Sequence, residues 1–135
     1  MEAGRSLFAG APYEGSIAKG GCINCHAFRN DDGDLAGGNI GPELTWSIRN
    51  RGRDYVKEHI INSRSHAPDS IMPTFKDYND AELESLILYL STFDYKLETK
   101  SEGQKLYDTY CVSCHGEDLD GKGRVSALLD PYPRN

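Results

Sequence analysis

The sequence predicts an all-α protein, because its clearest apolar patterns have helical spacing and no strand-rich stretch precedes either of its two cysteine motifs. The strongest pattern covers residues 79–93, where Asn79 and Glu82 are spaced as a capping box. Another helix is predicted over about residues 53–63. The inner faces of these two helices are expected to hold Leu83, Leu86, Ile87 and Leu90, and Tyr55, Val56, His59 and Ile60.

The pentapeptide Cys-x-x-Cys-His occurs twice, over residues 22–26 and 111–115, and it uses all four cysteines of the chain. This spacing is the attachment signature of c-type haem. Two thiols reach the two vinyl groups of one porphyrin, and the histidine that follows lies under the iron. The sequence therefore predicts two covalently attached haems, with four attachment residues and two iron ligands: Cys22, Cys25, Cys111 and Cys114, and His26 and His115.

Other uses of paired cysteines explain the pattern less well. A zinc site accounts for neither the histidine after each pair nor the long separation between the pairs. A thioredoxin-like redox pair needs a strand and a helix around it, and a disulfide framework leaves both histidines without a role. Haem attachment is the interpretation that uses every residue of both motifs.

Composition limits the classes of partner. The chain has 135 residues, a hydrophobic content of 38% and a formal net charge of −6. An acidic chain is unsuited to nucleic acid, whose binding depends on Lys and Arg, and it favours a basic protein partner that is steered electrostatically. A local basic concentration, Arg49, Arg51, Arg53, Lys57 and Arg64, is interpreted as solvated surface, with contact to haem propionates or to a partner as the alternative.

The chain contains a faint internal repeat. A Gly-x-x-x-aromatic segment precedes each motif, Gly4 to Phe8 in one case and Gly103 to Tyr107 in the other. The aromatic residue stands 14 residues before the first motif but only 4 before the second. Ser101 and Gln104 are spaced as a capping box for the second of these helices. Residues 30–41 are rich in Asp, Asn and Gly and are expected to form a surface loop.

Residues 1–97 resemble a complete class I cytochrome c domain, similar to the small bacterial members. The resemblance is carried, in the order of that family, by Gly4 with Phe8, the first haem motif, the segment 41–44 (Gly-Pro-Glu-Leu), Met72-Pro73, and a C-terminal amphipathic helix with Tyr89. It implies that the first and last helices of the domain cross, and that Gly4, Phe8 and Tyr89 meet at the crossing.

The resemblance also implies the surroundings of the first haem. The backbone carbonyl of Pro42 should accept a hydrogen bond from the ring of His26, which fixes the orientation of the ligand. Met72 lies 46 residues after His26 and is the expected sixth ligand, although a methionine can also serve as a core gap-filler. Trp46 is expected to pack at the edge of the haem.

Residues 98–135 look like a partial second cytochrome c unit. Only 20 residues follow His115, and they contain no methionine and no closing helix. Several explanations remain open. The chain continues in a longer protein that supplies the missing parts, or His59 or His66 is the sixth ligand of the second haem. The second haem can also be five-coordinate, or a partner chain completes it.

These features predict a dihaem electron-transfer protein that works between redox partners, with a membrane respiratory complex as one candidate partner. No apolar run is long enough to span a membrane. The N-terminus does not resemble a signal peptide, so the sequence is expected to be a mature or excised form of a periplasmic or otherwise extracytoplasmic protein. The alternatives are a peroxidase-like dihaem enzyme with an open second haem, and a haem subunit or fragment of a larger respiratory complex.

Overall fold

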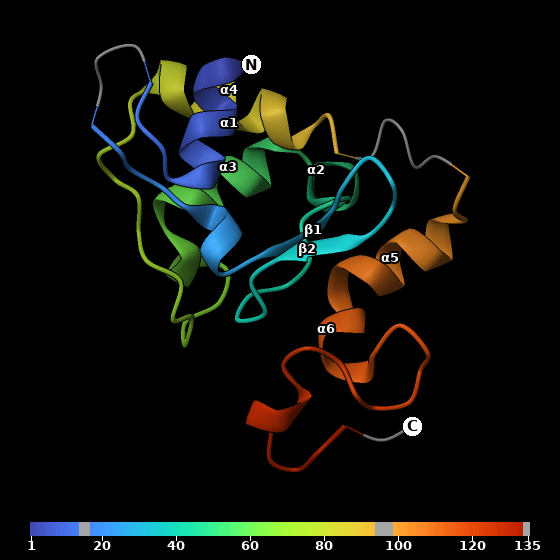
Figure 1. Ribbon diagram of the computed structural model, residues 1–135. Coiled ribbons are helices and arrows are strands. Elements are labelled where there is room, and N and C mark those ends of the chain that lie inside the picture. Colours follow the sequence, from blue (N-terminus) through green and yellow to red (C-terminus); the bar gives the residue numbers. More distant parts are fainter. Residues whose placement is uncertain (14–16, 94–98, 134–135) are drawn as a thin grey trace.

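The computed structural model describes residues 1–13, 17–93 and 99–133. The fold is mainly helical, as predicted, and its arrangement is that of a class I cytochrome c with one small sheet (Figure 1). The expected boundary between residues 97 and 98 lies outside the described residues. None of the helices within the described ranges is long and apolar enough to cross a bilayer.

The α-helices of the described residues are α1 (Glu2–Ala9), α2 (Ser47–Arg51), α3 (Arg53–Ile61), α4 (Asp80–Leu90), α5 (Glu102–Tyr110) and α6 (Val112–His115), and the strands are β1 (Ala27–Arg29) and β2 (Leu35–Gly37). Three short 3-10 helices cover Cys22–Asn24, Ser63–Ser65 and Ser126–Leu128.

Helices α1 and α4 cross in close contact, and Gly4 is the point of closest approach (Figure 1). A Cβ atom added at Gly4 would lie 2.9 Å from the Cβ of Tyr89 and closer still to the carbonyl of Ser85. The ring of Phe8 packs next to the crossing, 5.6 Å from the ring of Tyr89 between centroids. The predicted meeting of these residues is therefore confirmed. The crossing closes a core of nine buried side chains: Leu7, Phe8, Val56, Ile60, Tyr78, Leu83, Leu86, Ile87 and Leu90.

Helix α4 begins with the predicted capping box. The side chain of Asn79 accepts a hydrogen bond from the N–H of Glu82, and the carboxylate of Glu82 accepts one from the N–H of Asn79, both at 2.9 Å. The helix ends at Leu90 instead of residue 92 or 93, because the N–H groups of Thr92 and Phe93 turn to the carbonyls three residues earlier. Likewise, α3 ends at Ile61, two residues before its predicted end.

Strand β2 lies where the sequence predicted only a surface loop. The side chain of Asn30 accepts hydrogen bonds from the N–H groups of Asp32 and Asp34, at 3.0 and 2.9 Å. Gly33 takes a φ of 87°, which closes the turn. The turn pairs β1 with β2 antiparallel, with Phe28 opposite Ala36. The expected surface loop over residues 30–41 is therefore only partly present, because residues 30–34 form a turn and residues 35–37 form a strand.

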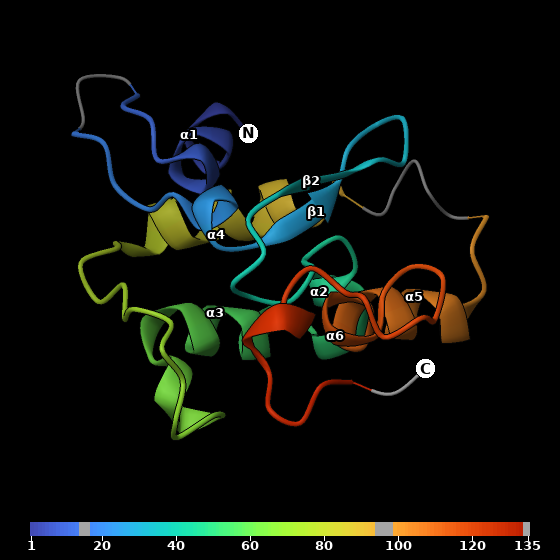
Figure 2. The same ribbon diagram turned by 60° about the horizontal axis from the view of Figure 1, so that its bottom comes forward.

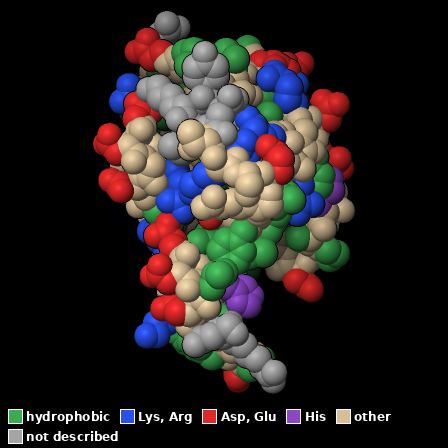
Figure 3. Space-filling view, turned by 90° about the vertical axis from the view of Figure 1, so that its right-hand side faces the viewer, with side chains coloured by type: hydrophobic (Ala, Val, Ile, Leu, Met, Phe, Trp, Pro, Cys, Tyr) green, Lys and Arg blue, Asp and Glu red, His purple; other side chains and the backbone are tan. Residues whose placement is uncertain are grey.

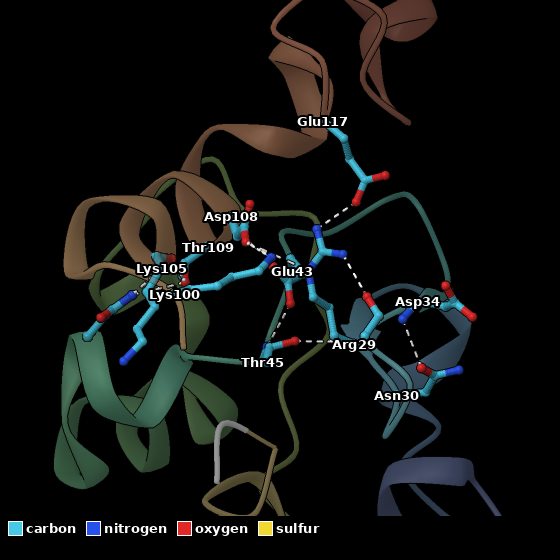
Figure 4. Close-up of polar contacts among 12 residues, drawn as sticks. Arg29, Asn30, Asp34, Glu43, Thr45, Lys100, Lys105, Asp108, Thr109 and Glu117 are labelled. Atoms are coloured by element: carbon cyan, nitrogen blue, oxygen red, sulfur yellow. Dashed lines mark hydrogen bonds and ion pairs between the residues drawn. The ribbon is translucent and has the colours of Figure 1, made fainter. Parts of the chain in front are cut away.

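The segment that contains the second haem motif docks on the first part of the chain through Arg29. The guanidinium group of Arg29 donates to the carbonyl of Gly33 at 2.8 Å and to Glu117 at 2.6 Å, and its Nε lies 3.7 Å from a carboxylate oxygen of Asp108 (Figure 4). Lys100 donates to the same oxygen of Asp108 at 2.7 Å. A single buried arginine thus connects the β-hairpin with α5 and with the segment after α6.

Helix α5 lies beside α2, as Figures 1 and 2 both show. The side-chain amide of Asn50 donates to the hydroxyl of Thr109 at 3.0 Å and to the carbonyl of Lys105 at 3.4 Å. Ser101 caps the start of α5 by accepting from the N–H of Gln104 at 3.2 Å, as its sequence spacing predicted. These contacts fix the end of α5, and with it Cys111, relative to the first part of the chain.

Glu43 lies at this junction and is fully buried. One of its carboxylate oxygens accepts from the N–H of Thr45 at 3.3 Å, and the other has no hydrogen-bond partner among the described residues. Burial raises the pKa of Glu43 from 4.5 to about 7, and the negative charge of Asp108 adds to this rise. The hydrogen bonds from Thr45 and the charge of Arg29 oppose it without cancelling it.

Gly4→Ala is expected to lower the free energy of unfolding by about 1 to 3 kcal/mol, because the new methyl group must separate α1 from α4. Gly103→Ala is the matched control, since no atom lies within 4 Å of a Cβ at that position in α5. The higher helix propensity of alanine should leave this variant unchanged or stabilise it by up to about 1 kcal/mol. Denaturant unfolding of the holoprotein measures both values, and equal stabilities for the two variants would contradict the role of Gly4.

Glu43→Gln is expected to remove a pH-dependent component of stability. Because the pKa of Glu43 is raised in the folded state, its stabilising contribution is complete below about pH 4.5 and is lost as the pH rises through about 7. The unfolding free energies of parent and variant, measured from pH 4 to 8, should therefore diverge by about 3 kcal/mol over this window. Glu117→Gln, which removes an exposed carboxylate from the same arginine, is the control. A constant difference between Glu43→Gln and the parent would contradict the prediction.

Candidate haem-binding site

The first haem motif forms a tight turn that places its histidine in the interior. Residues Cys22–Asn24 make one turn of 3-10 helix after Gly21, whose φ is 88°. His26 is only 8% exposed. Its Nδ1 lies 2.8 Å from the backbone carbonyl oxygen of Pro42, which is the hydrogen bond implied by the resemblance. Because the carbonyl can only accept, Nδ1 carries the proton and Nε2 keeps its lone pair for a metal ion.

The ring of His26 rests against the backbone of Gly41. The two residues form a β-bridge, and a Cβ atom at Gly41 would overlap the imidazole ring. Burial lowers the pKa of His26, although the hydrogen bond to Pro42 acts in the opposite direction. The imidazole is therefore neutral at physiological pH, which is the form that binds metal ions.

A cavity of about 440 Å³ opens beside His26 and has the donor atoms that a haem iron requires. Cys22 and His26 line one part of it, and Met72 lines it as well. Apolar side chains form a large part of the remaining wall, among them Leu44, Val56, Ile60, Leu86 and Leu90, and polar side chains such as Glu43 and Arg51 line it as well. A thiol for covalent attachment, an imidazole and a thioether within an apolar shell are the chemistry of c-type haem ligation, so the residues present fit this cofactor.

The loop that carries Met72 is held by two serines. Ser63, which is fully buried, donates from its hydroxyl to the carbonyl of Met72 at 3.0 Å. The N–H of Met72 donates to the hydroxyl of Ser70 at 3.2 Å. These bonds fix the backbone on both sides of the side chain, which packs against the core of the protein. Neither serine carries a sequence signal that would have predicted this role.

Two histidines that were candidates for the second haem lie in the first cavity. His59 and His66 both line it, and the ring of Tyr55 is stacked on that of His66 with centroids 3.9 Å apart. The Nδ1 atoms of both histidines are buried without a hydrogen-bond partner among the described residues. Burial, together with the charges of His66, His26 and Arg51, lowers the pKa of His59.

Trp46, which is expected to pack at the haem edge, lies under the segment that leads into α5. It is completely buried but does not line the cavity. The ammonium group of Lys100 lies 5.2 Å from the centroid of its ring, so the indole forms part of the packing under the segment that leads into α5. The aromatic character of Trp46 predicted burial, but sequence alone did not show which neighbour would cover it.

The second motif repeats the local geometry of the first. Helix α5 ends at Tyr110, and α6 carries the remainder of the motif to His115. A glycine packs against the backbone between the two cysteines in each case: Gly38 against residues 24 and 25, and Gly123 against residues 113 and 114. These are equivalent positions of the two motifs, so the internal repeat extends beyond the pentapeptides. The internal repeat in the sequence did not reveal these glycines, because Gly38 and Gly123 follow their motifs at different distances.

The second motif is less enclosed than the first. His115 is exposed, whereas His26 is buried. Figure 3 shows hydrophobic side chains gathered between the main body and the narrower C-terminal part, with a histidine beside them. The large apolar side chains that are exposed in this part of the chain include Tyr110, Leu119, Leu128, Leu129 and Tyr132.

Two family models match the chain. The model described as "Cytochrome C oxidase, cbb3-type, subunit III" matches residues 15–90, which include the first motif and Met72. The model described as "Cytochrome c" matches residues 101–134, which include the second motif.

No curated protein and no solved structure matches the chain. Cytochrome c domains carry a covalently attached c-type haem with its iron, and they generally act as electron carriers. Because the first of the two matches covers more than half of the chain, the protein belongs to the c-type cytochromes, in the family described as cytochrome c oxidase, cbb3-type, subunit III.

Proposed function

We propose that the protein is a dihaem c-type cytochrome that transfers electrons between redox partners outside the cytoplasm. The observation that carries this proposal is the first cavity, which brings Cys22, His26 and Met72 together in an apolar shell. In the proposed site Cys22 and Cys25 attach the first haem, and His26 and Met72 are its axial ligands. Bound haem supplies a single reversible electron exchange at its iron.

The residues of the cavity suit a carrier better than a catalyst. Pro42 holds His26 in one tautomer, and Ser63 and Ser70 hold the backbone of Met72. Two protein ligands fixed in this way leave no position for a substrate and require little rearrangement between oxidation states. A methionine–histidine ligand pair favours a higher reduction potential, and the apolar walls keep water from the site.

Cys111, Cys114 and His115 are proposed to hold the second haem. The support is the repeated geometry, in which Gly123 takes the place of Gly38. The proposal does not assign the sixth ligand of this haem. His59 and His66 both line the first cavity, which favours a ligand from elsewhere: a continuation of the chain, a partner chain, or none.

The proposed partners follow from charge and from the family match. The net charge of −6 favours a partner with a basic docking surface, and weak, small interfaces are usual in such redox encounters. The family description supports a second candidate function, in which the chain is a haem-carrying part of a respiratory complex. The alternative is a peroxidase-like activity. It would be favoured if the second haem, at the exposed His115, has an open coordination position.

Met72→Ala is expected to leave both haems attached while the reduction potential of one of them falls, because that iron loses its thioether ligand. The same haem should gain the ability to bind carbon monoxide in the reduced state, with one equivalent per chain. Ile71→Ala is the matched control, since the neighbouring Ile71 is 81% exposed. Potentiometric titration and carbon monoxide difference spectra measure both effects. An unchanged titration for Met72→Ala would remove this residue from the coordination sphere.

The haem count and the carbon monoxide stoichiometry of the parent protein test the proposed function directly. Intact mass and haem absorbance should give two haems per chain, and one haem in a variant with Cys111→Ser and Cys114→Ser. A carrier with two closed sites binds no carbon monoxide when it is fully reduced. Binding of one equivalent would identify an open second haem and move the enzyme or the incomplete-subunit interpretation ahead of the simple carrier. A parent protein with a single haem would contradict the dihaem proposal.

A further inference from the structure

The second unit (residues 98–135) forms part of the wall of the cavity that lies in the first unit (residues 1–97). Thr109 and Tyr110, the last two residues of α5, line the cavity together with residues of the first unit. Their position is fixed by the bond from Asn50 to Thr109 and by the ion pair between Arg29 and Asp108. Tyr110 also stands immediately before Cys111, the first attachment residue of the second motif.

Arg51 lies at this junction and is held by aromatic rings from both units. Its guanidinium carbon is 4.4 Å from the ring centroid of Tyr110 and 4.9 Å from that of Tyr55. Stacking of this kind stabilises a cation and restricts its orientation. Contacts with ring faces do not use the N–H groups of a guanidinium, so these donors remain available.

Arg51 differs from its neighbours in having no carboxylate partner. Arg49 pairs with Glu102 at 3.3 Å, and Arg53 pairs with Glu84 at 2.8 Å. Within residues 1–13, 17–93 and 99–133, no ion pair or hydrogen bond of the Arg51 side chain to an acidic residue is found, although its side chain lines the cavity. A planar guanidinium group in a fixed position is the side chain best suited to bind a carboxylate through two parallel hydrogen bonds.

Polar side chains without hydrogen-bond partners among the described residues line the same cavity as Arg51. His59 and His66 stack with Tyr55, and their Nδ1 atoms lack partners among the described side chains. The buried hydroxyl of Ser47, in the same helix as Arg51, is also without a partner there. The walls formed by Leu86 and Leu90 are apolar. A haem carries its two carboxylates on one edge, and Arg51 is the one Lys or Arg side chain among the described residues that line the cavity, which indicates where that edge is accommodated.

We propose that Arg51 binds a propionate carboxylate of the first haem, and that Tyr110 of the second unit is the positioning residue that holds the guanidinium group against it. This inference rests on the proposed function, because it requires a haem on Cys22 and Cys25. Its consequence is that the reduction potential of the first haem depends on the docked second unit. A positive charge beside a haem disfavours its oxidised form, so the docked second unit raises the reduction potential of the first haem.

The test is a potentiometric titration of holoprotein variants, in which the first haem is identified as the one whose potential changes in Met72→Ala. Arg51→Gln should shift this haem to lower potential, whereas Arg53→Gln removes the same charge two residues away and should shift it much less. Tyr110→Leu should lower the potential in the same direction, and Tyr110→Phe, which keeps the ring, should retain the parent value. In the Arg51→Gln background, Tyr110→Leu should have no further effect, because it acts through Arg51.

Several outcomes would overturn the inference. The first is an Arg51→Gln shift no larger than that of Arg53→Gln, and the second is a Tyr110→Leu shift that persists in full without Arg51. A shift confined to the second haem would assign the carboxylate to that haem and contradict the proposal as stated. Absorbance spectra of each variant report whether both haems are attached and Met72 is bound. Failure of the proposed function would therefore show as a missing first haem, whereas failure of this inference would show as a loaded haem with an unchanged potential.

Discussion

The hydrogen bond between the ring of His26 and the carbonyl of Pro42 is the constraint on which the rest of the site depends. It can form only because Gly41 lets the backbone of residues 41 and 42 pass directly against the imidazole. The β-hairpin after the motif and the bridge between His26 and Gly41 bring the two segments together. Once this bond fixes the ring, its other nitrogen is left free in a side chain that lines the cavity.

The second constraint is the junction between the two motif-bearing segments, which is polar and buried. Arg29 forms ion pairs with two carboxylates, that of Asp108 in α5 and that of Glu117 in the segment that follows α6. Of these two, only Asp108 is buried, whereas Glu117 is half exposed, and removing one member of a buried pair typically costs about 3 to 5 kcal/mol. Glu43 adds a carboxyl group that is more easily kept neutral than ionised in this position. The junction therefore orients the second motif more specifically than an apolar contact of the same area would.

Sequence reasoning succeeded where the determinants are local or belong to a spaced motif. The capping box of Asn79 and Glu82 involves neighbours in the chain, and the meeting of Gly4, Phe8 and Tyr89 follows from a pattern shared with class I cytochromes c. It failed where the determinant is a contact between distant segments. Strand β2 depends on pairing with β1, and Trp46 is covered by Lys100, a residue 54 positions later. The part that α5 plays in the first cavity has no local signal at all, because Thr109 and Tyr110 resemble ordinary helix-end residues.

The position of α5 also has a consequence for how the molecule matures. Cys22 precedes the first residue of α5 by 80 residues, so a chain synthesised from its N-terminus completes the first motif, Met72 and α4 before this wall exists. Domains generally fold as units in that order. During this interval the side of the first cavity that Thr109 and Tyr110 later line is not yet covered. A haem attached at the proposed residues Cys22 and Cys25 in this interval would enter before that side is covered, and docking of α5 would then complete the wall beside it.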